Sequence, residues 1–278
     1  MRIEYESKYF NVKDTLECGQ IFRFRQFEKG YLVFSKDKAC YAYNDGERAV
    51  IVCDDGDKDY FTDFFDLGRD YEKICSFAET CGFEVVKKAA AQASGVRILN
   101  QEKQETLFSF LTSQNNHIPR IKGIIERTCE ARGEKKSFSG VEYYSFPSAS
   151  ALYDEKIDFY NGLGYGYRSD FIRLAANALK NDPTALDGLS ELPTPELKKS
   201  LMSFKGVGPK VADCVSLFAY HRTDAFPVDT WIEKLYREDF GGKEKDRNKI
   251  TKFFTDTFGE NSGYVQQYVF YYKRNLNI

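Results

Sequence analysis

The sequence predicts an α+β fold, with an N-terminal antiparallel β-rich domain at residues 1–95 and a mostly helical domain at residues 96–278. Between Ile3 and Cys53, short runs of high β propensity follow one another closely, which favours an antiparallel sheet. From Tyr60 onward, apolar residues recur at helical spacing instead. The length of 278 residues suits two domains of ordinary size.

The expected strands are bounded by Gly and Asp turns. Residues 22–25 alternate aromatic and basic side chains, and residues 31–35 and 49–53 are rich in β-forming side chains. Apolar residues at 60–67 and at 107–111 fit one face of a helix. Four prolines then separate segments of helical pattern, so the remainder is expected to be helical with short connectors.

The composition excludes several classes of protein. The chain is 42% hydrophobic and 16% aromatic, which is enough for a packed core. No apolar run approaches the roughly 20 residues that cross a bilayer, and no apolar signal core follows Met1. We therefore expect no membrane association and a cytoplasmic protein, near the nucleoid if the source is bacterial. The seven cysteines include no C-x-x-C pair, so we expect no metal ion and no cofactor.

The net charge of −2 argues mildly against a nucleic-acid partner. The distribution of charge weakens that argument. Acidic residues gather at 54–70, whereas basic residues gather at 120–127, 198–210 and 243–249. A nearly neutral chain can still present one basic surface.

The most informative segment is residues 197–218. Residues 197–203 can form a helix, and Gly206 and Gly208 permit a tight turn with close backbone approach. Pro209 suits the first turn of a second helix. Backbone N–H groups at such a helix start can bind a phosphate oxygen, although a G-x-G before a helix also occurs as a simple connector.

Asp229 precedes another predicted helix, so its side chain is expected to cap that helix. A capping carboxylate is held rigidly at the helix end, which is compatible with a role in chemistry. Two segments resemble the helix-hairpin-helix DNA glycosylase superfamily. They are Gly206-Val207-Gly208-Pro209-Lys210-Val211-Ala212-Asp213 and Pro227-Val228-Asp229.

The resemblance implies that Lys210 and Asp229 are catalytic. An ordinary lysine is protonated, and the positive end of a helix favours the neutral amine. That amine would attack C1′ of a sugar and form a Schiff base. Asp229 would stabilise the positive charge that develops on the sugar. Lys210 argues against the purely hydrolytic branches, and no cysteine follows Cys214, which excludes the downstream four-cysteine iron–sulfur cluster.

The rest of the chain resembles the 8-oxoguanine DNA glycosylase family, and a bacterial-type member is expected. Gly19, in a G-Q-x-F-R-like element, would accept a hydrogen bond from N7–H of 8-oxoguanine, which normal guanine cannot donate. Phe270 would stack on the base, Gln266 would bond its Watson–Crick edge and Cys214 would face Phe270. The alternative to these binding roles is a purely structural one, in which Gly19 forms a strand bulge or turn and Phe270 and Cys214 are core residues.

Two further segments resemble the parts of the family that enter the duplex. Asn115 would fill the space of the flipped base, and Arg120 would read the orphaned cytosine; a polar connecting loop is the alternative. Tyr167 would wedge into the stack, and Arg168 would be a second cytosine reader. One departure is Trp231, where eukaryotic members carry a phosphate-contacting histidine.

The sequence therefore predicts a DNA glycosylase and AP lyase that excises 8-oxoguanine, opposite cytosine, from double-stranded DNA. The protein is expected to act as a monomer. One rival is the same fold with another oxidised base as substrate. The other is a non-catalytic DNA-binding module, since helix-hairpin-helix units also serve as phosphate anchors.

Overall fold

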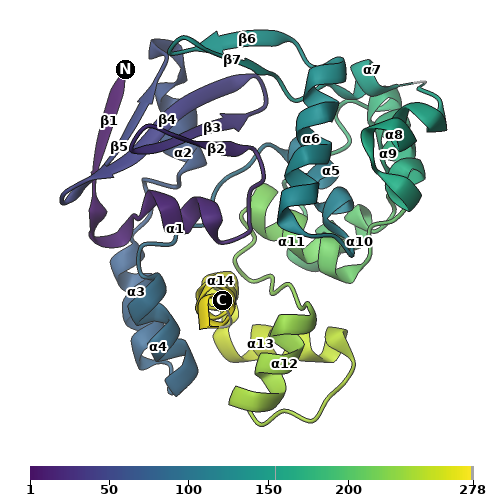
Figure 1. Ribbon diagram of the computed structural model, residues 1–278. Coiled ribbons are helices and arrows are strands. Elements are labelled where there is room, and N and C mark those ends of the chain that lie inside the picture. The colour runs from purple at the N-terminus through teal and green to yellow at the C-terminus, as the bar shows by residue number, and fades with distance from the viewer. Residues whose placement is uncertain (154, 277–278) are drawn as a thin grey trace.

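A computed structural model describes residues 1–153 and 155–276. Its N-terminal part is a five-stranded antiparallel sheet in the order β1-β5-β4-β3-β2, and a two-stranded hairpin, β6-β7, lies beyond it (Figure 1). The strands are β1 (Arg2–Glu6), β2 (Phe24–Phe27), β3 (Gly30–Ser35), β4 (Lys38–Asp45), β5 (Arg48–Cys53), β6 (Lys135–Phe138) and β7 (Val141–Tyr144). The predicted α+β fold is confirmed.

The two faces of the sheet are covered by different elements. On one face, Val33 and Ile51 pack with the aromatic side chains of α2 (Lys58–Phe64). On the other face, Phe34 and Leu32 pack with Phe138 of β6. Burial on both faces gives β3 a nearly continuous apolar sequence rather than a strict alternation.

The structure corrects three local expectations. The strand expected at 22–25 is β2 at 24–27, because Arg23 turns inward and pairs with the buried Glu105 at 3.1 Å. A short helix, α1 (Val12–Glu17), lies inside the region expected to hold strands, capped by Asn11. The segment expected to be wholly helical contains the β6-β7 hairpin, which pairs Phe138 with Val141 across a tight turn.

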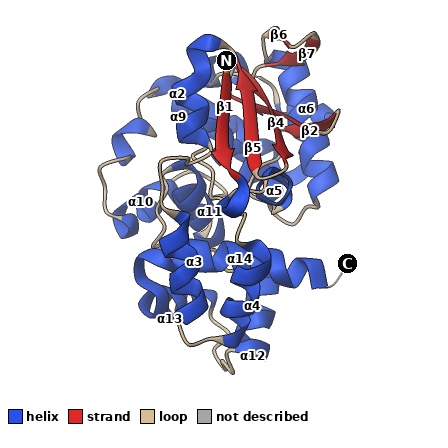
Figure 2. Cartoon of the chain, turned by 90° about the vertical axis from the view of Figure 1, so that its left-hand side faces the viewer, coloured by secondary structure: helices blue, strands red, loops and turns tan. Residues whose placement is uncertain are grey.

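The helices form two groups below and beside the sheet (Figures 1 and 2). They are α3 (Tyr71–Thr80), α4 (Glu84–Ala93), α5 (Lys103–Ser113), α6 (Ile118–Arg132), α7 (Ala149–Leu152), α8 (Ile157–Leu163), α9 (Ser169–Asn181), α10 (Thr194–Leu201), α11 (Pro209–Ala219), α12 (Thr230–Asp239), α13 (Arg247–Phe258) and α14 (Ser262–Leu276). The described residues contain no bilayer-spanning helix.

Helices α3 and α4 follow the sheet in sequence but pack against α14, at the other end of the chain. Helices α5 and α6 pack with α8, α9 and α11 in the second group. The domain boundary near residue 95 stays a prediction, since residues 71–93 contribute to the helical part of the molecule.

A fully buried arginine joins the N-terminal segments. Arg97 donates to the carbonyl oxygens of Phe65 at 2.9 Å and Tyr9 at 3.1 Å, and also to that of Asp66. Its guanidinium carbon lies 3.9 Å from the centroid of the Tyr71 ring. These carbonyls are taken out of water, so their bonds to Arg97 are needed to keep them satisfied.

Replacing Arg97 with methionine keeps the aliphatic bulk but leaves those carbonyl oxygens without a donor. We expect Arg97→Met to lower the free energy of unfolding by about 3 kcal/mol or more, measured by urea denaturation. Arg48→Met is the control, because Arg48 is exposed and its ion pair with Glu4 should contribute less than about 1 kcal/mol. Equal losses in the two variants would contradict the role given to Arg97.

Candidate active site

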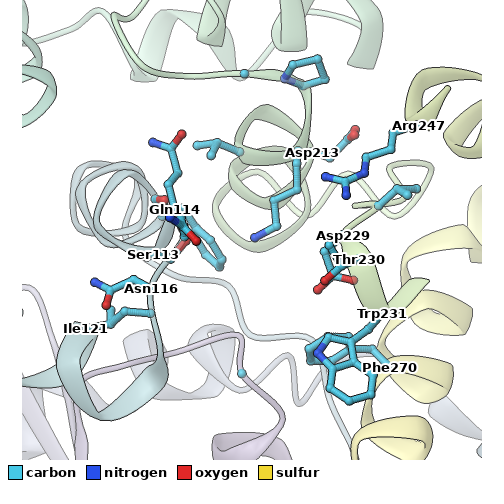
Figure 3. A pocket seen from close by; sticks show the side chains of 18 of the residues that line it. Ser113, Gln114, Asn116, Ile121, Asp213, Asp229, Thr230, Trp231, Arg247 and Phe270 are labelled. Carbon is cyan, nitrogen blue, oxygen red and sulfur yellow. Dashed lines mark hydrogen bonds between the residues drawn. The ribbon is translucent and has the colours of Figure 1, made fainter. Parts of the chain in front are cut away.

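A cavity of about 760 Å³ opens where the two helical groups meet the loop after α1. Its lining comes from the ends of six segments: the turn at Gly19, the end of α5, and the starts of α6, α11, α12 and α13. Phe270 of α14 closes one side (Figure 3). Residues more than 200 positions apart in sequence therefore share one site.

The glycine turn before α11 has the form expected from the sequence. Gly206 has φ of +89°, and a Cβ there would lie 2.4 Å from the ring of Phe171. Gly208 is extended and serves as the N-cap, and Pro209 is the first residue of α11. The helix-hairpin-helix unit is thus formed by α10, the Gly206–Gly208 turn and α11, with the start of α11 facing the cavity.

Lys210 lies in the first turn of α11 and lines the cavity. Its side chain is half-buried, and Nζ lies 5.4 Å from the centroid of the Phe110 ring. The backbone N–H groups at the start of α11 contribute positive potential at this point. The amine is therefore held against an aromatic wall at the positive end of a helix.

Asp229 is the N-cap of α12, as predicted, and its Oδ1 accepts a hydrogen bond from the backbone N–H of Ile232 at 2.9 Å. It also lines the cavity, where it lies beside Thr230 in Figure 3. The capping bond fixes the direction of the carboxylate, so one side chain both starts a helix and presents negative charge to the site.

Gly19 and Phe270 meet on the opposite wall. Gly19 has φ of +92°, and a Cβ there would lie 3.5 Å from Cε1 of Phe270. The turn is fastened to α14, since Tyr271 donates to Asp14 at 2.6 Å and Gln267 donates to Cys18 at 3.2 Å. The turn interpretation of Gly19 and its place at the cavity are therefore both found in the structure.

Two of the residues expected in the base pocket do not line this cavity. Cys214 is buried within α11, and burial raises the pKa of its thiol to about 11. Gln266 is also buried, and among the described residues its amide oxygen has no hydrogen-bond partner. Their roles at a base stay predictions.

Of the four residues expected to enter a duplex, Asn115 lines the cavity, whereas Arg120, Tyr167 and Arg168 are not part of its lining. Asn115 is exposed, has φ of +45° and lines the cavity. Arg120 is exposed and donates to the carbonyl of Gly164 at 3.3 Å. Tyr167 is 59% exposed, whereas Arg168 is only 3% exposed. Both of these lie in the short 3₁₀ turn η3 (Gly166–Arg168).

Sequence reasoning missed two charged residues of the lining, Asp213 and Arg247 (Figure 3). Asp213 could have been found, because it follows Lys210 by three residues and so shares its face of α11. Arg247 was noted only as part of the basic run at 243–249. It begins a helix 18 residues beyond Asp229 and pairs with Glu233 at 3.1 Å, so its sequence position did not indicate a place at the cavity.

Asp213 is a buried carboxylate. Nζ of Lys198, in α10, lies 2.5 Å from its Oδ1 and forms an ion pair with it. Burial raises the pKa of Asp213 to about 6, and the charges of Lys198 and then Lys210 oppose that rise. Among the described residues, no group of three or more His, Cys, Asp or Glu side chains gathers as metal ligands would.

The Gly206 contact predicts a sharp difference between the two hairpin glycines. Gly206→Ala requires a positive φ for alanine and a displacement of the Phe171 ring, so we expect it to cost about 2–4 kcal/mol of stability. Gly208→Ala meets no atom within 4 Å and is the matched control. Thermal unfolding of the two variants measures this, and a Gly208→Ala loss as large as that of Gly206→Ala would refute the steric argument.

Asp213 predicts a pH dependence of stability. Its folded pKa lies above the ordinary value of 3.8, so the folded state holds this proton more tightly and stability falls as pH rises from about 4 to about 6. Asp213→Asn should remove a fall of about 2–3 kcal/mol. The measurement is the thermal unfolding midpoint of the wild type and of the variant at pH 4.5 and at pH 6.5. Relative to the wild type, the variant should be more stable at pH 6.5 than at pH 4.5. If the difference between the two proteins is the same at both pH values, Asp213 does not cause the pH dependence.

The chain is similar in sequence and in structure to known proteins of one family. The family described as 8-oxoguanine DNA glycosylase, N-terminal domain, matches residues 2–107. A Saccharomyces cerevisiae protein named N-glycosylase/DNA lyase is 36% identical over 167 residues. That match covers 55% of this chain and 44% of the yeast protein, so it spans less than half of the relative's length.

Two solved structures resemble the chain from end to end. MBOgg1, in complex with a low affinity DNA ligand, has 36% identity and a TM-score of 0.94, covering 100% of this chain and 96% of that one. Clostridium acetobutylicum 8-oxoguanine glycosylase/lyase, bound to double-stranded DNA with cytosine opposite 8-oxoguanine, has 33% identity and a TM-score of 0.92, covering 100% and 99%. Because identity above 30% extends over nearly the whole of both chains, this chain belongs to the 8-oxoguanine DNA glycosylase family.

Proposed function

We propose that the chain is a bifunctional DNA N-glycosylase and AP lyase that excises 8-oxoguanine, opposite cytosine, from double-stranded DNA. The observation that supports this most is the meeting of Lys210 and Asp229 in one cavity, an amine at a helix start and a carboxylate fixed by its cap. The names of the yeast relative and of the Clostridium structure support the same activity.

The proposed chemistry begins at the Lys210 amine. Its nitrogen attacks C1′ of the lesion's sugar, the bond from C1′ to the base breaks, and the base leaves with the bonding electrons. The sugar ring then opens to a Schiff base with the lysine. Loss of a C2′ proton expels the 3′ phosphate by β-elimination, which cleaves the strand 3′ to the lesion.

Asp229 acts while the bond from the sugar to the base breaks. Positive charge develops on the sugar at that moment, and a carboxylate already oriented by its bond to Ile232 stabilises it without reorganisation. Because Asp229 cannot turn away without leaving α12 uncapped, its direction is part of the fold.

The wall of Gly19 and Phe270 suits a flat base. The ring of Phe270 lies against the Gly19 turn, so a base stacked on the ring would meet the Gly19 carbonyl at its edge. That carbonyl accepts from the N7–H of 8-oxoguanine and repels the N7 lone pair of guanine. Cys214 and Gln266 are proposed to complete the pocket from within α11 and α14.

The rim of the cavity is proposed to hold the DNA. Backbone N–H groups after Gly206 and Gly208, at the start of α11, bind phosphate oxygens. Asn115 fills the gap left by the flipped base, Tyr167 supports the neighbouring stack and Arg120 reads the orphaned cytosine. All of these groups come from one chain, which supports action as a monomer.

Lys210→Gln tests the proposal directly. Borohydride reduces a Schiff base to a stable bond, so wild type should form a covalent adduct with a duplex containing 8-oxoguanine opposite cytosine. Denaturing gels detect this adduct. The Lys210→Gln variant should form no adduct, whereas the control variant Lys205→Gln, at an exposed lysine, should form as much as the wild type. Absence of an adduct with the wild type would favour the non-catalytic DNA-binding module. Stronger trapping on another oxidised base would favour the rival substrate.

A further inference from the structure

Arg247 is a charged residue of the cavity that the proposed chemistry does not use. It is the first residue of α13, and its side chain lines the cavity together with Lys210 and Asp229. Figure 3 shows its guanidinium group directed from α13 toward the cavity, on the side of Asp229. The side chain is 48% exposed, so an incoming molecule can reach it. A cation therefore lies beside the place where the sugar of a lesion would react.

Glu233 of α12 fixes the direction of this guanidinium group. Nε and Nη2 of Arg247 both donate to Oε2 of Glu233, at 3.2 Å and 3.1 Å. The carboxylate is itself held, because it is partly buried and a second cation, Arg237, lies 3.8 Å from its Oε1. Nη1 of Arg247 has no hydrogen-bond partner within residues 1–153 and 155–276. Glu233 thus occupies one edge of the planar group and leaves the other edge for an acceptor from outside.

The neighbours of Arg247 on this wall of the cavity are uncharged. Thr230 and Trp231 line the cavity at the start of α12, and Asn248 and Thr251 line it from α13. Hydroxyl, indole and amide groups can donate a hydrogen bond, but they cannot neutralise an anion. Among the described residues that α12 and α13 contribute to the lining, Arg247 is the one with a positive charge. Any anion bound at this wall would therefore depend on it.

A phosphate of the damaged strand is the anion that suits this position. The phosphates on both sides of a nucleotide are only a few covalent bonds from C1′ of its sugar. A sugar held between Lys210 and Asp229 therefore brings a flanking phosphate into the same cavity, which Arg247 also lines. The two N–H groups along one edge of a guanidinium match two oxygens of a phosphate, and the edge formed by Nη1 and Nη2 is the one that Glu233 leaves open.

We propose that Arg247 binds a phosphate that flanks the lesion nucleotide, and that Glu233 orients Arg247 for this contact. The inference rests on the proposed function, because it assigns a further DNA contact to that same site. The contact is separate from the backbone N–H groups at the start of α11, since it comes from a side chain of α13. It holds the sugar of the lesion on the side of the cavity where Asp229 stabilises the developing charge.

The salt dependence of DNA binding tests this contact without the chemistry. All proteins carry Lys210→Gln, so the duplex with 8-oxoguanine opposite cytosine stays intact, and its affinity is measured between about 50 and about 200 mM salt. Adding Arg247→Gln should weaken binding and make the slope of log affinity against log salt shallower by about one. The control is Lys245→Gln, which removes the same charge at an exposed residue outside the cavity and should leave the slope nearly unchanged. Equal changes of slope in the two variants would overturn the proposal.

Neutral linkages in the DNA show which phosphate Arg247 contacts. A methylphosphonate, which replaces one charged oxygen with a methyl group, is placed either 5′ or 3′ to the lesion nucleotide. At the contacted position it should weaken binding by about fivefold or more when Arg247 is present, and by less than about twofold in Arg247→Gln, because the interaction is already lost there. Such coupling at either position supports the proposal. Independent effects at both positions would overturn it.

The contact and the proposed function fail in different ways. If the wild type forms no borohydride adduct but Arg247→Gln alone makes the slope shallower, the catalytic activity is overturned and the contact to DNA stands. If the wild type forms the adduct but Arg247→Gln and Lys245→Gln have the same slope, the contact is overturned and the activity stands. Both substitutions lie at exposed side chains, and thermal unfolding checks that each variant is folded.

Discussion

The close contact between Gly206 and the Phe171 ring is the constraint on which the site depends. With no Cβ at Gly206, the hairpin backbone lies directly on the ring, and its positive φ reverses the chain between α10 and α11. That reversal sets where α11 begins and so where Lys210 points. Phe171 also packs edge-on against Tyr167, so the glycine hairpin that positions Lys210 and the 3₁₀ turn η3 contact the same aromatic ring.

A second constraint couples Asp229 to the fold. Its Oδ1 accepts from the Ile232 N–H at the start of α12, and the same side chain lines the cavity. Lys210, the proposed nucleophile, does not cap its helix, because Gly208 holds that position, and its Nζ lies over the Phe110 ring. The two groups thus differ in kind: the position of the amine follows from the hairpin, whereas the position of the carboxylate is itself a stabilising interaction.

The parts of the site that could be predicted from sequence are those whose physics is local. The glycines, Pro209 and the cap at Asp229 act within a few residues, so their spacing reveals them. The surroundings of Arg168 could not be predicted, because its partners are the carbonyls of a turn more than 50 residues away. The β6-β7 hairpin could not be predicted for a related reason. Its side chains pack against Phe34 and Leu32 of β3, which lie about 100 residues earlier in the chain.

The charges in the cavity explain how a chain of net charge −2 suits an anionic partner. Four charged side chains line it: Lys210, Arg247, Asp213 and Asp229. Lys198 neutralises Asp213 from behind, so that carboxylate adds little negative field toward the opening. What remains is the positive start of α11, Lys210 and Arg247, opposed by Asp229, whose carboxylate caps α12. Local arrangement, and not net charge, therefore sets the field that a phosphate backbone would meet.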